Sequence, residues 1–396
     1  MESDVIVVGA GPAGSVLAYL LAKRGVNILL IEKETLPRYK PCGGGIPWKT
    51  VHSLPVDVSP ALDLEARWGI LSYSGRQMLH VPLKDFGWLT MRDRFDYFLV
   101  QEAVKAGAIL LEGLAVYRLE EEDERMAVYT GKDTCYARLV VGADGVNSKV
   151  AVCSGLLQNR ETGTALEAEL EVSPAILAEY GSTVIFDFGA LERGYGWIFS
   201  KRDHLSAGVF RARSGSAGNM KRQLEQFLSQ QPMLDSYRTM TVQGHRIPLG
   251  GAFQPLHHGR VLLVGDAANL ADAWIGEGIY HAVRSAHIAA EEIPAILESS
   301  PFDAGRYTRR VHAEIVSELK AARRFARLVY SYPWQCSVAL TRSPQMQKIV
   351  FGNIRGDVSL QDMVGQLLIT SPRILYEVLR NRKLASLQHA KAVETL

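Results

Sequence analysis

The feature that most constrains the fold is a glycine-rich turn set between an apolar strand and a helix near the start of the chain. Val5–Val8 is an uncharged run typical of a buried parallel strand. Gly9-x-Gly11-x-x-Gly14 follows it and opens a helical stretch, and Glu32 ends the next apolar run 18 residues after Gly14. This order of elements is the full fingerprint of a dinucleotide-binding βαβ unit.

Each residue of the fingerprint has a physical task. Gly9 permits the tight turn, Gly11 lets the backbone approach a pyrophosphate, and Gly14 allows the helix to pack closely on the strand. The helix N-terminus offers free N–H groups to phosphate oxygens, and the Glu32 carboxylate accepts hydrogen bonds from ribose hydroxyls. The predicted cofactor-binding residues of this unit are Gly9, Gly11, Pro12, Ala13, Gly14, Glu32 and Lys33. The alternative is a glycine-rich turn without a ligand.

Two later predicted strands are each followed by an aspartate that could contact the same ligand. The apolar runs 138–142 and 260–264 are followed by Asp144 and Asp266, each next to glycine. Because the carboxyl ends of parallel strands meet a ligand at one edge of the sheet, we expect both carboxylates there. Asp144 has an alternative role as the cap of a turn, since Asp-Gly is common turn chemistry.

Composition excludes several classes of protein. Lys and Arg number 44 and Asp and Glu 42, so the net charge of +2 gives no reason to expect nucleic-acid binding. The four cysteines are widely spaced and form no CxxC pair, so neither a disulfide framework nor a metal site is expected. Residues 5–22 are uncharged, but Pro12 would break one continuous helix, so a membrane span is rejected. We expect a cytoplasmic protein.

The three nucleotide-site segments together resemble the p-hydroxybenzoate hydroxylase superfamily of flavoproteins. Leu263-Val264-Gly265-Asp266 is similar to its second flavin-binding motif, and Gly142-Ala143-Asp144-Gly145 to its middle motif. The resemblance implies FAD as the cofactor. It also implies cofactor contacts at Arg92, Asp144, Asp266, Gly276, Gly278 and Ile279. The backbone N–H groups that follow Gly276 would stabilise negative charge on a reduced flavin ring. For Arg92, a solvated surface arginine is the alternative.

Two further segments resemble the geranylgeranyl reductase family. They are Pro37-Arg38-Tyr39-Lys40-Pro41-Cys42-Gly43-Gly44-Gly45 and Tyr195-Gly196-Trp197-Ile198-Phe199-Ser200-Lys201. The resemblance covers essentially the whole chain. It implies an FAD-dependent oxidoreductase that saturates carbon–carbon double bonds of a geranylgeranyl chain on a lipid, chlorophyll-type, diphosphate or quinone substrate. It also implies Cys42, Gly43 and Gly44 near the flavin, with Cys42 as the proton donor or as a residue that shapes the site. NADPH or a ferredoxin-like protein would supply the electrons.

Tyr195, Trp197 and Phe199 are the predicted substrate-contacting residues. They alternate along the chain, so on a strand all three face one side and form an apolar wall suited to a polyprenyl chain. Their spacing alone favours a role in ordinary core packing, whereas the family resemblance favours a role in contacting the substrate.

The expected fold is α/β, and α+β overall. A Rossmann-type FAD-binding lobe (residues 1–75, 91–160 and 252–305) holds an inserted antiparallel-sheet substrate lobe (76–90 and 161–251), and a helical C-terminal region (306–396) follows. That region is rich in Arg and Lys, which suggests peripheral contact with a membrane, against a solvated face packed on the FAD lobe.

Two alternative activities stay open at the level of sequence. The second hypothesis for an enzyme is a flavin-dependent monooxygenase or halogenase of the same fold that acts on an apolar substrate. The halogenase Trp-x-Trp-x-Ile-Pro signature is not reproduced at 195–200. The non-enzymatic hypothesis is a protein that carries a lipid or a flavin without catalysing a reaction. The complete Cys42 loop argues against it.

Overall fold

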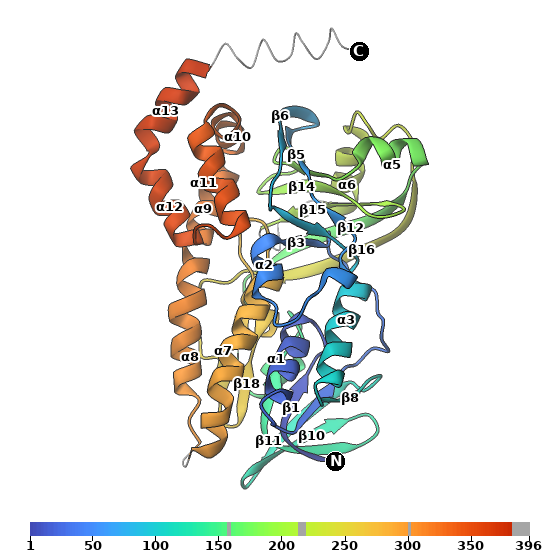
Figure 1. Ribbon diagram of the computed structural model, residues 1–396, viewed down its shortest axis with the longest axis vertical. Coiled ribbons are helices and arrows are strands. Elements are labelled where there is room, and N and C mark those ends of the chain that lie inside the picture. Colours follow the sequence, from blue (N-terminus) through green and yellow to red (C-terminus); the bar gives the residue numbers. More distant parts are fainter. Residues whose placement is uncertain (157–159, 213–218, 300–301, 382–396) are drawn as a thin grey trace.

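Two sheets lie one above the other along the long axis of the molecule, and a column of helices runs beside both (Figure 1). The computed structural model describes residues 1–156, 160–212, 219–299 and 302–381. The N-terminal sheet and its helices form the lower part of the view, and the second sheet forms the upper part. The arrangement confirms the expected α/β fold with an inserted sheet and a helical C-terminal region.

The lower sheet has eight strands and a parallel centre. Its main path runs β17-β18-β11-β1-β2-β8, with β10 and β9 attached to β11. The neighbours of β1, which are β11 and β2, are both parallel to it, as are the pairs β2–β8 and β11–β18. The bounds are β1 Glu2–Val8, β2 Ile28–Ile31, β8 Ile109–Leu111, β9 Val116–Glu122, β10 Arg125–Thr130, β11 Thr134–Gly142, β17 His257–His258 and β18 Val261–Leu263.

Three helices pack around this sheet and bury its central strands. They are α1 (Pro12–Ala22), α3 (Arg92–Lys105) and α7 (Ile279–Glu298). Val5, Ile6 and Val7 are fully buried, as expected for a strand covered on both faces. Pro12 occupies the first turn of α1, where its missing N–H costs no hydrogen bond. The carboxyl edge of β1, β11 and β18 therefore faces the start of α1.

The upper sheet has seven strands in the order β16-β12-β15-β14-β13-β5-β6. The strands expected to form an antiparallel sheet, β12 to β15, do pair antiparallel, and among the described strands the one parallel pair in this sheet is that of β13 with β5. β5 lies within residues 1–75, yet it pairs with β6 and β13 in the upper sheet. The bounds are β5 Trp68–Tyr73, β6 Arg76–Pro82, β12 Thr162–Glu171, β13 Thr183–Asp187, β14 Gly194–Ser200, β15 Leu205–Arg211 and β16 Arg238–Pro248.

The two faces of the upper sheet have different partners. α5 (Pro174–Tyr180) and α6 (Met220–Ser229) cover one face with a small core that includes Ile198, Leu224 and Phe227. Alternate residues of the same strands, among them Tyr195 and Trp197, belong to a separate core shared with the C-terminal helices. Because side chains alternate between the two faces of a strand, one face of the sheet packs on α5 and α6 and the other lies next to the site.

Short elements join the two sheets. β3 (Gly45–Pro47), β4 (Leu64–Glu65) and β7 (Gly87–Leu89) form a three-stranded sheet. The helix α2 (Trp48–Ser53) follows β3, α4 (Lys149–Cys153) follows β11, and single 3-10 turns cover Ser59–Ala61 and Gly265–Ala268.

The C-terminal helices form the column beside both sheets (Figure 1). They are α8 Gly305–Val311, α9 Ser317–Ser331, α10 Pro333–Arg342, α11 Pro344–Arg355, α12 Leu360–Ile369 and α13 Ser371–Arg380, with a π-helical turn at His312–Val316 between α8 and α9. Within the described ranges, no helix combines the length and apolar character needed to cross a bilayer. Residues 382–396 of the expected C-terminal region lie outside the described residues.

Candidate active site

One continuous cavity of about 880 Å³ lies between the two sheets. Of the residues singled out from the sequence, all but Gly14 line it. These are Gly9, Gly11, Pro12, Ala13, Glu32, Lys33, Cys42, Gly43, Gly44, Arg92, Asp144, Asp266, Gly276, Gly278, Ile279, Tyr195, Trp197 and Phe199. The fold therefore brings together segments that are far apart in the sequence.

The glycines of the fingerprint have the geometry that their spacing predicts. Gly9 has φ +104°, and a Cβ there would lie 2.5 Å from the carbonyl oxygen of Ala143. Gly14 packs against the first strand instead of lining the cavity, because a Cβ would lie 1.9 Å from the carbonyl oxygen of Gly9. At Gly11, by contrast, a Cβ would meet only the Arg38 Nη2 atom, at 3.9 Å. The space over the N-terminus of α1 is open to a ligand.

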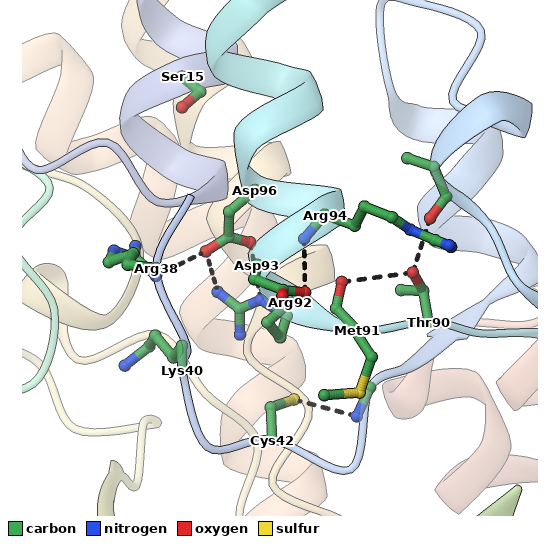
Figure 2. Close-up of polar contacts among 12 residues, drawn as sticks. Ser15, Arg38, Lys40, Cys42, Thr90, Met91, Arg92, Asp93, Arg94 and Asp96 are labelled. Atoms are coloured by element: carbon green, nitrogen blue, oxygen red, sulfur yellow. Dashed lines mark hydrogen bonds and ion pairs between the residues drawn. The ribbon is translucent and has the colours of Figure 1, made fainter. Parts of the chain in front are cut away.

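A buried ion network lies beside this open space (Figure 2). Asp96 joins two arginines: Arg92 Nε donates to its Oδ1 at 2.7 Å, and Arg38 Nη1 lies 3.2 Å from its Oδ2. Burial works against the charge on Arg92, but the Asp96 carboxylate outweighs burial and raises the pKa of Arg92. Arg92 is therefore no solvated surface arginine. The Lys40 side chain lies in the same group, and burial and the Arg92 charge lower its pKa.

Glu32 directly follows β2 and lines the open space over the N-terminus of α1. Its Oε2 accepts from Ala10 N at 2.8 Å, and its Oε1 accepts from Glu34 N at 3.1 Å. The side chain is buried and lines the cavity. The backbone thus fixes the carboxylate at the edge of the cavity, and Arg38 Nε lies 3.8 Å from Oε2. Lys33 is exposed at the rim, beside Glu34.

The two aspartates at the strand ends have different surroundings. Asp144 accepts from Ser148 Oγ at 2.5 Å and from Lys149 N at 2.6 Å, so it caps the start of α4 as well as lining the cavity. The side-chain carboxylate of Asp266 accepts no hydrogen bond from the residues that the structure describes, whereas its backbone carbonyl accepts from Asn269 N at 3.1 Å. Burial raises the pKa of Asp266, while Lys40 and Arg92 oppose the rise. Asp266 is the carboxylate that is free to meet a hydroxyl group.

The Gly276–Gly278 loop is held from beneath by a buried carboxylate. Asp272 accepts from Trp274 N at 2.7 Å and from Glu277 N at 2.6 Å. Burial raises the pKa of Asp272 to about 6, and Glu277 adds to the rise. Lys49 Nζ in turn contacts Glu277 Oε2 at 2.7 Å. The helix α7 begins three residues after Gly276, at Ile279, and among the described residues no side chain caps it.

The Cys42 loop is fixed by a buried lysine. Lys201, 1% exposed, donates from Nζ to the carbonyl oxygens of Gly43 at 2.7 Å and of Thr90 at 2.9 Å. Cys42 Sγ accepts from Gly44 N at 3.4 Å (Figure 2). Burial lowers the pKa of Lys201, and nearby carboxylates oppose that effect. The lysine that follows the aromatic segment thus positions the Cys42 loop next to that segment.

The three aromatic residues of β14 form one wall of the cavity, as their alternation predicts. Tyr195 OH donates to the carbonyl oxygen of Ile275 at 2.7 Å, which ties the wall to the Gly276 loop. Trp197 reaches the Cys42 loop, because a Cβ on Gly43 would lie 2.8 Å from its Nε1. Within the described part of the chain, that Nε1 is buried and has no hydrogen-bond partner.

Beyond this wall the cavity becomes apolar. The upper sheet contributes Leu71, Leu79, Val81, Val184, Phe186 and Phe188, and α10 and α11 contribute Leu340, Val350, Phe351 and Ile354. The cavity therefore has a polar end over α1 and an apolar end between the upper sheet and the C-terminal helices. A ligand with a charged nucleotide part and a second, hydrocarbon ligand would find matching surroundings at the two ends.

The residues at the polar end fit FAD. Within the described residues, an uncapped helix N-terminus over an open glycine suits a pyrophosphate, as do the buried Arg92 and the largely buried Arg38. Glu32 suits a ribose, and the Asp266 carboxylate suits a further hydroxyl group. The buried Trp197 Nε1 has no hydrogen-bond partner within the described residues.

Sequence reasoning missed several residues of the cavity. Lys40 Nζ lies 3.1 Å from His245 Nε2, and burial, with the Lys40 charge, lowers the pKa of His245 to about 3. Glu167, on β12, also lines the cavity. A signal for Glu167 was available, because Glu167 and Glu169 alternate with Leu166, Ala168 and Leu170 in an otherwise apolar strand. His245 lies in a polar strand and gave no such signal.

Comparisons with known proteins agree on the family. A family profile described as FAD binding domain matches residues 2–313. A digeranylgeranylglycerophospholipid reductase of Methanopyrus kandleri is 30% identical over 83% of this chain and 91% of its own length. A geranylgeranyl diphosphate reductase of Rhodobacter capsulatus is 32% identical over 76% and 77%.

Solved structures share the fold. A geranylgeranyl bacteriochlorophyll reductase-like protein of Thermoplasma acidophilum has a TM-score of 0.74 and 21% identity, over 96% of this chain and 99% of that one. A flavin-dependent brominase has a TM-score of 0.73 and 18% identity, over 94% and 100%. At these sequence identities the solved structures show only that the fold is shared, and reductases and halogenases both have this fold.

Proposed function

Because the chain belongs to the geranylgeranyl reductase family of FAD-dependent oxidoreductases, we propose that it saturates isolated double bonds of a geranylgeranyl chain held in the apolar end of its cavity. The observation that supports this substrate most strongly is the continuity of that end with the nucleotide groove. A hydrocarbon chain would lie against aromatic and aliphatic side chains, with one end near the Cys42 and Gly276 loops.

FAD, when bound, supplies a hydride from its reduced ring to one carbon of the double bond. We infer that Gly9, Gly11 and the start of α1 hold its pyrophosphate and that Glu32 holds its ribose. The Cys42–Gly44 loop and the N-terminus of α7 would flank the ring. The uncapped N–H groups of α7 place partial positive charge there, which favours a negatively charged reduced ring.

Other residues of the cavity provide the conditions that an alkene, a poor hydride acceptor, requires. An unactivated alkene needs a positioned acid and exclusion of water. Tyr195, Trp197 and Phe199 exclude water from one side, and α10 and α11 close the apolar end. Lys201 holds the Cys42 loop in place. We infer that Cys42, tied to Gly44 N, shapes this loop.

A substrate panel tests this function. The purified enzyme, reduced under argon, is mixed separately with geranylgeranyl-bearing glycerolipid, diphosphate, quinone and chlorophyll-type substrates, and the products are analysed by mass spectrometry. We expect hydrogen to be added in pairs to at least one of them, without oxygen. Oxygen insertion after air is admitted, with no hydrogenation before, would assign the chain to the monooxygenases. NADPH and reduced ferredoxin, tried separately as reductants, identify the donor.

We also propose that the C-terminal helices contact a membrane from which the substrate enters. The basic stretch of α8 and α9 does not support this contact well, because Arg310 pairs with Glu292 and Arg323 with Glu161. The outer surface of α12 and α13 fits better. Its exposed apolar residues are Leu368, Ile369, Leu375, Tyr376 and Leu379. Arg380 lies beside them, whereas Arg373 is paired with Glu377. Apolar and basic residues together favour an anionic bilayer surface.

Flotation with phosphatidylglycerol vesicles tests the contact. We expect the wild type to float and a double variant, Leu375→Glu with Leu379→Glu, to stay at the bottom of the gradient. Val152→Glu is the matched control, since Val152 is 71% exposed on α4 in the FAD lobe. Equal flotation of the double variant and the wild type would refute the contact surface.

A further inference from the structure

Two glutamates of β12 face the site side of the upper sheet, next to each other. Glu167 is only 2% exposed and lines the cavity, and Ser206 Oγ donates to its Oε1 at 2.9 Å. Glu169, also buried, lies two residues further along β12 and therefore on the same face as Glu167. A buried carboxyl pair is costly unless a proton or a cation balances it, so the pair needs an explanation.

The pair is connected to the protein surface. His204 Nε2 lies 3.1 Å from Glu169 Oε2, and His204 Nδ1 lies 2.6 Å from Asp203 Oδ1. The Asp203 side chain is 84% exposed, whereas that of His204 is nearly buried. Hydrogen-bonding groups therefore lead from solvent at Asp203 through His204 to Glu169, and Glu167 at the cavity is the next residue on the same face of β12.

The charges around the pair place its proton at the cavity end. Burial, followed by the charge of Glu169, raises the pKa of Glu167 to about 8. Burial also acts on Glu169, but the contact with His204 and the Lys201 charge outweigh it and lower its pKa. Burial opposes protonation of His204, yet its two carboxylate partners raise its pKa. Near neutral pH, Glu167 is a neutral acid and Glu169 an anion.

We propose that Glu167 donates the proton that completes reduction of the double bond, and that Glu169 and His204 reprotonate it from solvent. This role rests on the proposed function. The double bond gains a hydride from reduced FAD at one carbon, and the O–H bond of Glu167 breaks as a C–H bond forms at the other carbon. FAD is oxidised, the alkene is reduced, and the Glu167 carboxylate regains a proton along the series that starts at Asp203.

Titratable and polar groups from every neighbouring element surround Glu167. Glu169 lies on its own strand, Lys201 follows β14, Ser206 is on β15, His245 is on β16, and Tyr39 and Lys40 are on the loop before Cys42. Burial and the neighbouring cations keep His245 neutral, and the charges that act on the pKa of Glu167 are those of Glu169, which raises it, and Lys201, which lowers it. We expect the reduction rate to fall as pH rises through about 8, because Glu167 then loses its proton.

The test compares Glu167→Gln and Glu169→Gln with Glu171→Gln. Glu171 lies at the exposed end of the same strand, paired with Arg238, and is the matched control. Infrared spectroscopy of the oxidised, substrate-free holoenzyme follows the C=O stretch of a protonated carboxyl group across pH. Single-turnover reduction of a geranylgeranyl lipid under argon is measured in parallel, with FAD content as the check on folding.

We expect a protonated carboxyl band in the wild type and in E171Q that disappears above about pH 8 and is missing in E167Q. E167Q should reduce the lipid at least about 100-fold more slowly with unchanged FAD content. E169Q should move the alkaline limb of the rate to lower pH, because the negative charge that raises the pKa of Glu167 is gone. A wild-type band or rate in E167Q would overturn the role of Glu167, whereas a wild type that reduces no prenyl lipid would overturn the proposed function.

Discussion

Replacing Lys201 by methionine removes a buried side chain that ties the Cys42 loop to the strand end at Thr90. Methionine has a similar volume, so the main change is the loss of two hydrogen bonds to the carbonyl oxygens of Gly43 and Thr90. A buried carbonyl left without a donor costs about 1–3 kcal/mol, which gives about 2–6 kcal/mol for two. Removing a buried ammonium recovers part of this, so we expect a net loss of about 2–4 kcal/mol.

The loss is measured as the change in the free energy of urea unfolding, at one fixed FAD concentration, by circular dichroism and by FAD fluorescence on release. Lys221→Met is the matched control, because Lys221 is exposed on α6, and it should change stability by less than about 0.5 kcal/mol. K201M should also bind FAD more weakly, since the loop it holds lines the cavity. Stability and FAD affinity equal to those of the wild type would refute the idea that Lys201 positions the loop.

Three further changes have defined outcomes. Gly44→Ala should destabilise the protein by at least about 2 kcal/mol, because Gly44 has φ +68° and a Cβ would lie 1.9 Å from the carbonyl oxygen of Thr90; Gly45→Ala, whose Cβ would meet only an aromatic ring at 3.4 Å, should be tolerated in the same unfolding assay. Glu32→Ala should weaken FAD binding about tenfold or more in equilibrium dialysis, and unchanged affinity would count against a ribose contact. The raised pKa of Glu167 means that the folded state holds its proton more tightly than the unfolded chain. Its contribution to stability is therefore complete below pH 4.5 and lost as pH rises to about 8, and a urea-midpoint series in which E167Q keeps this loss would contradict the assignment.

Local patterns carried the sequence-based description of the nucleotide site. Gly9, Gly11 and Gly14 act through backbone geometry within one turn, so their spacing alone predicts where the backbone comes close to its neighbours. The alternation of Tyr195, Trp197 and Phe199 predicted that they share a face, because a strand has a period of two. What lies opposite that face required the fold.

Long-range pairings could not be read from the sequence. The parallel pair β13–β5 joins strands from two distant segments, and no local signal distinguishes a parallel from an antiparallel neighbour. The same is true of Arg38 and Asp96, and of Lys201 and Gly43, whose contacts depend on how the loops return to the cavity. Asp144 shows a second limit, because one carboxylate both caps a helix and lines the site.

The most direct test of prenyl reduction is a single turnover without oxygen. The FAD of the enzyme is fully reduced under argon and mixed with a geranylgeranyl lipid in excess, while flavin absorbance and product mass are followed together. We predict that the flavin is reoxidised at a rate that depends on lipid concentration, with one double bond saturated for each FAD. A flavin that stays reduced until air is admitted, with oxygen then found in the product, would contradict the account.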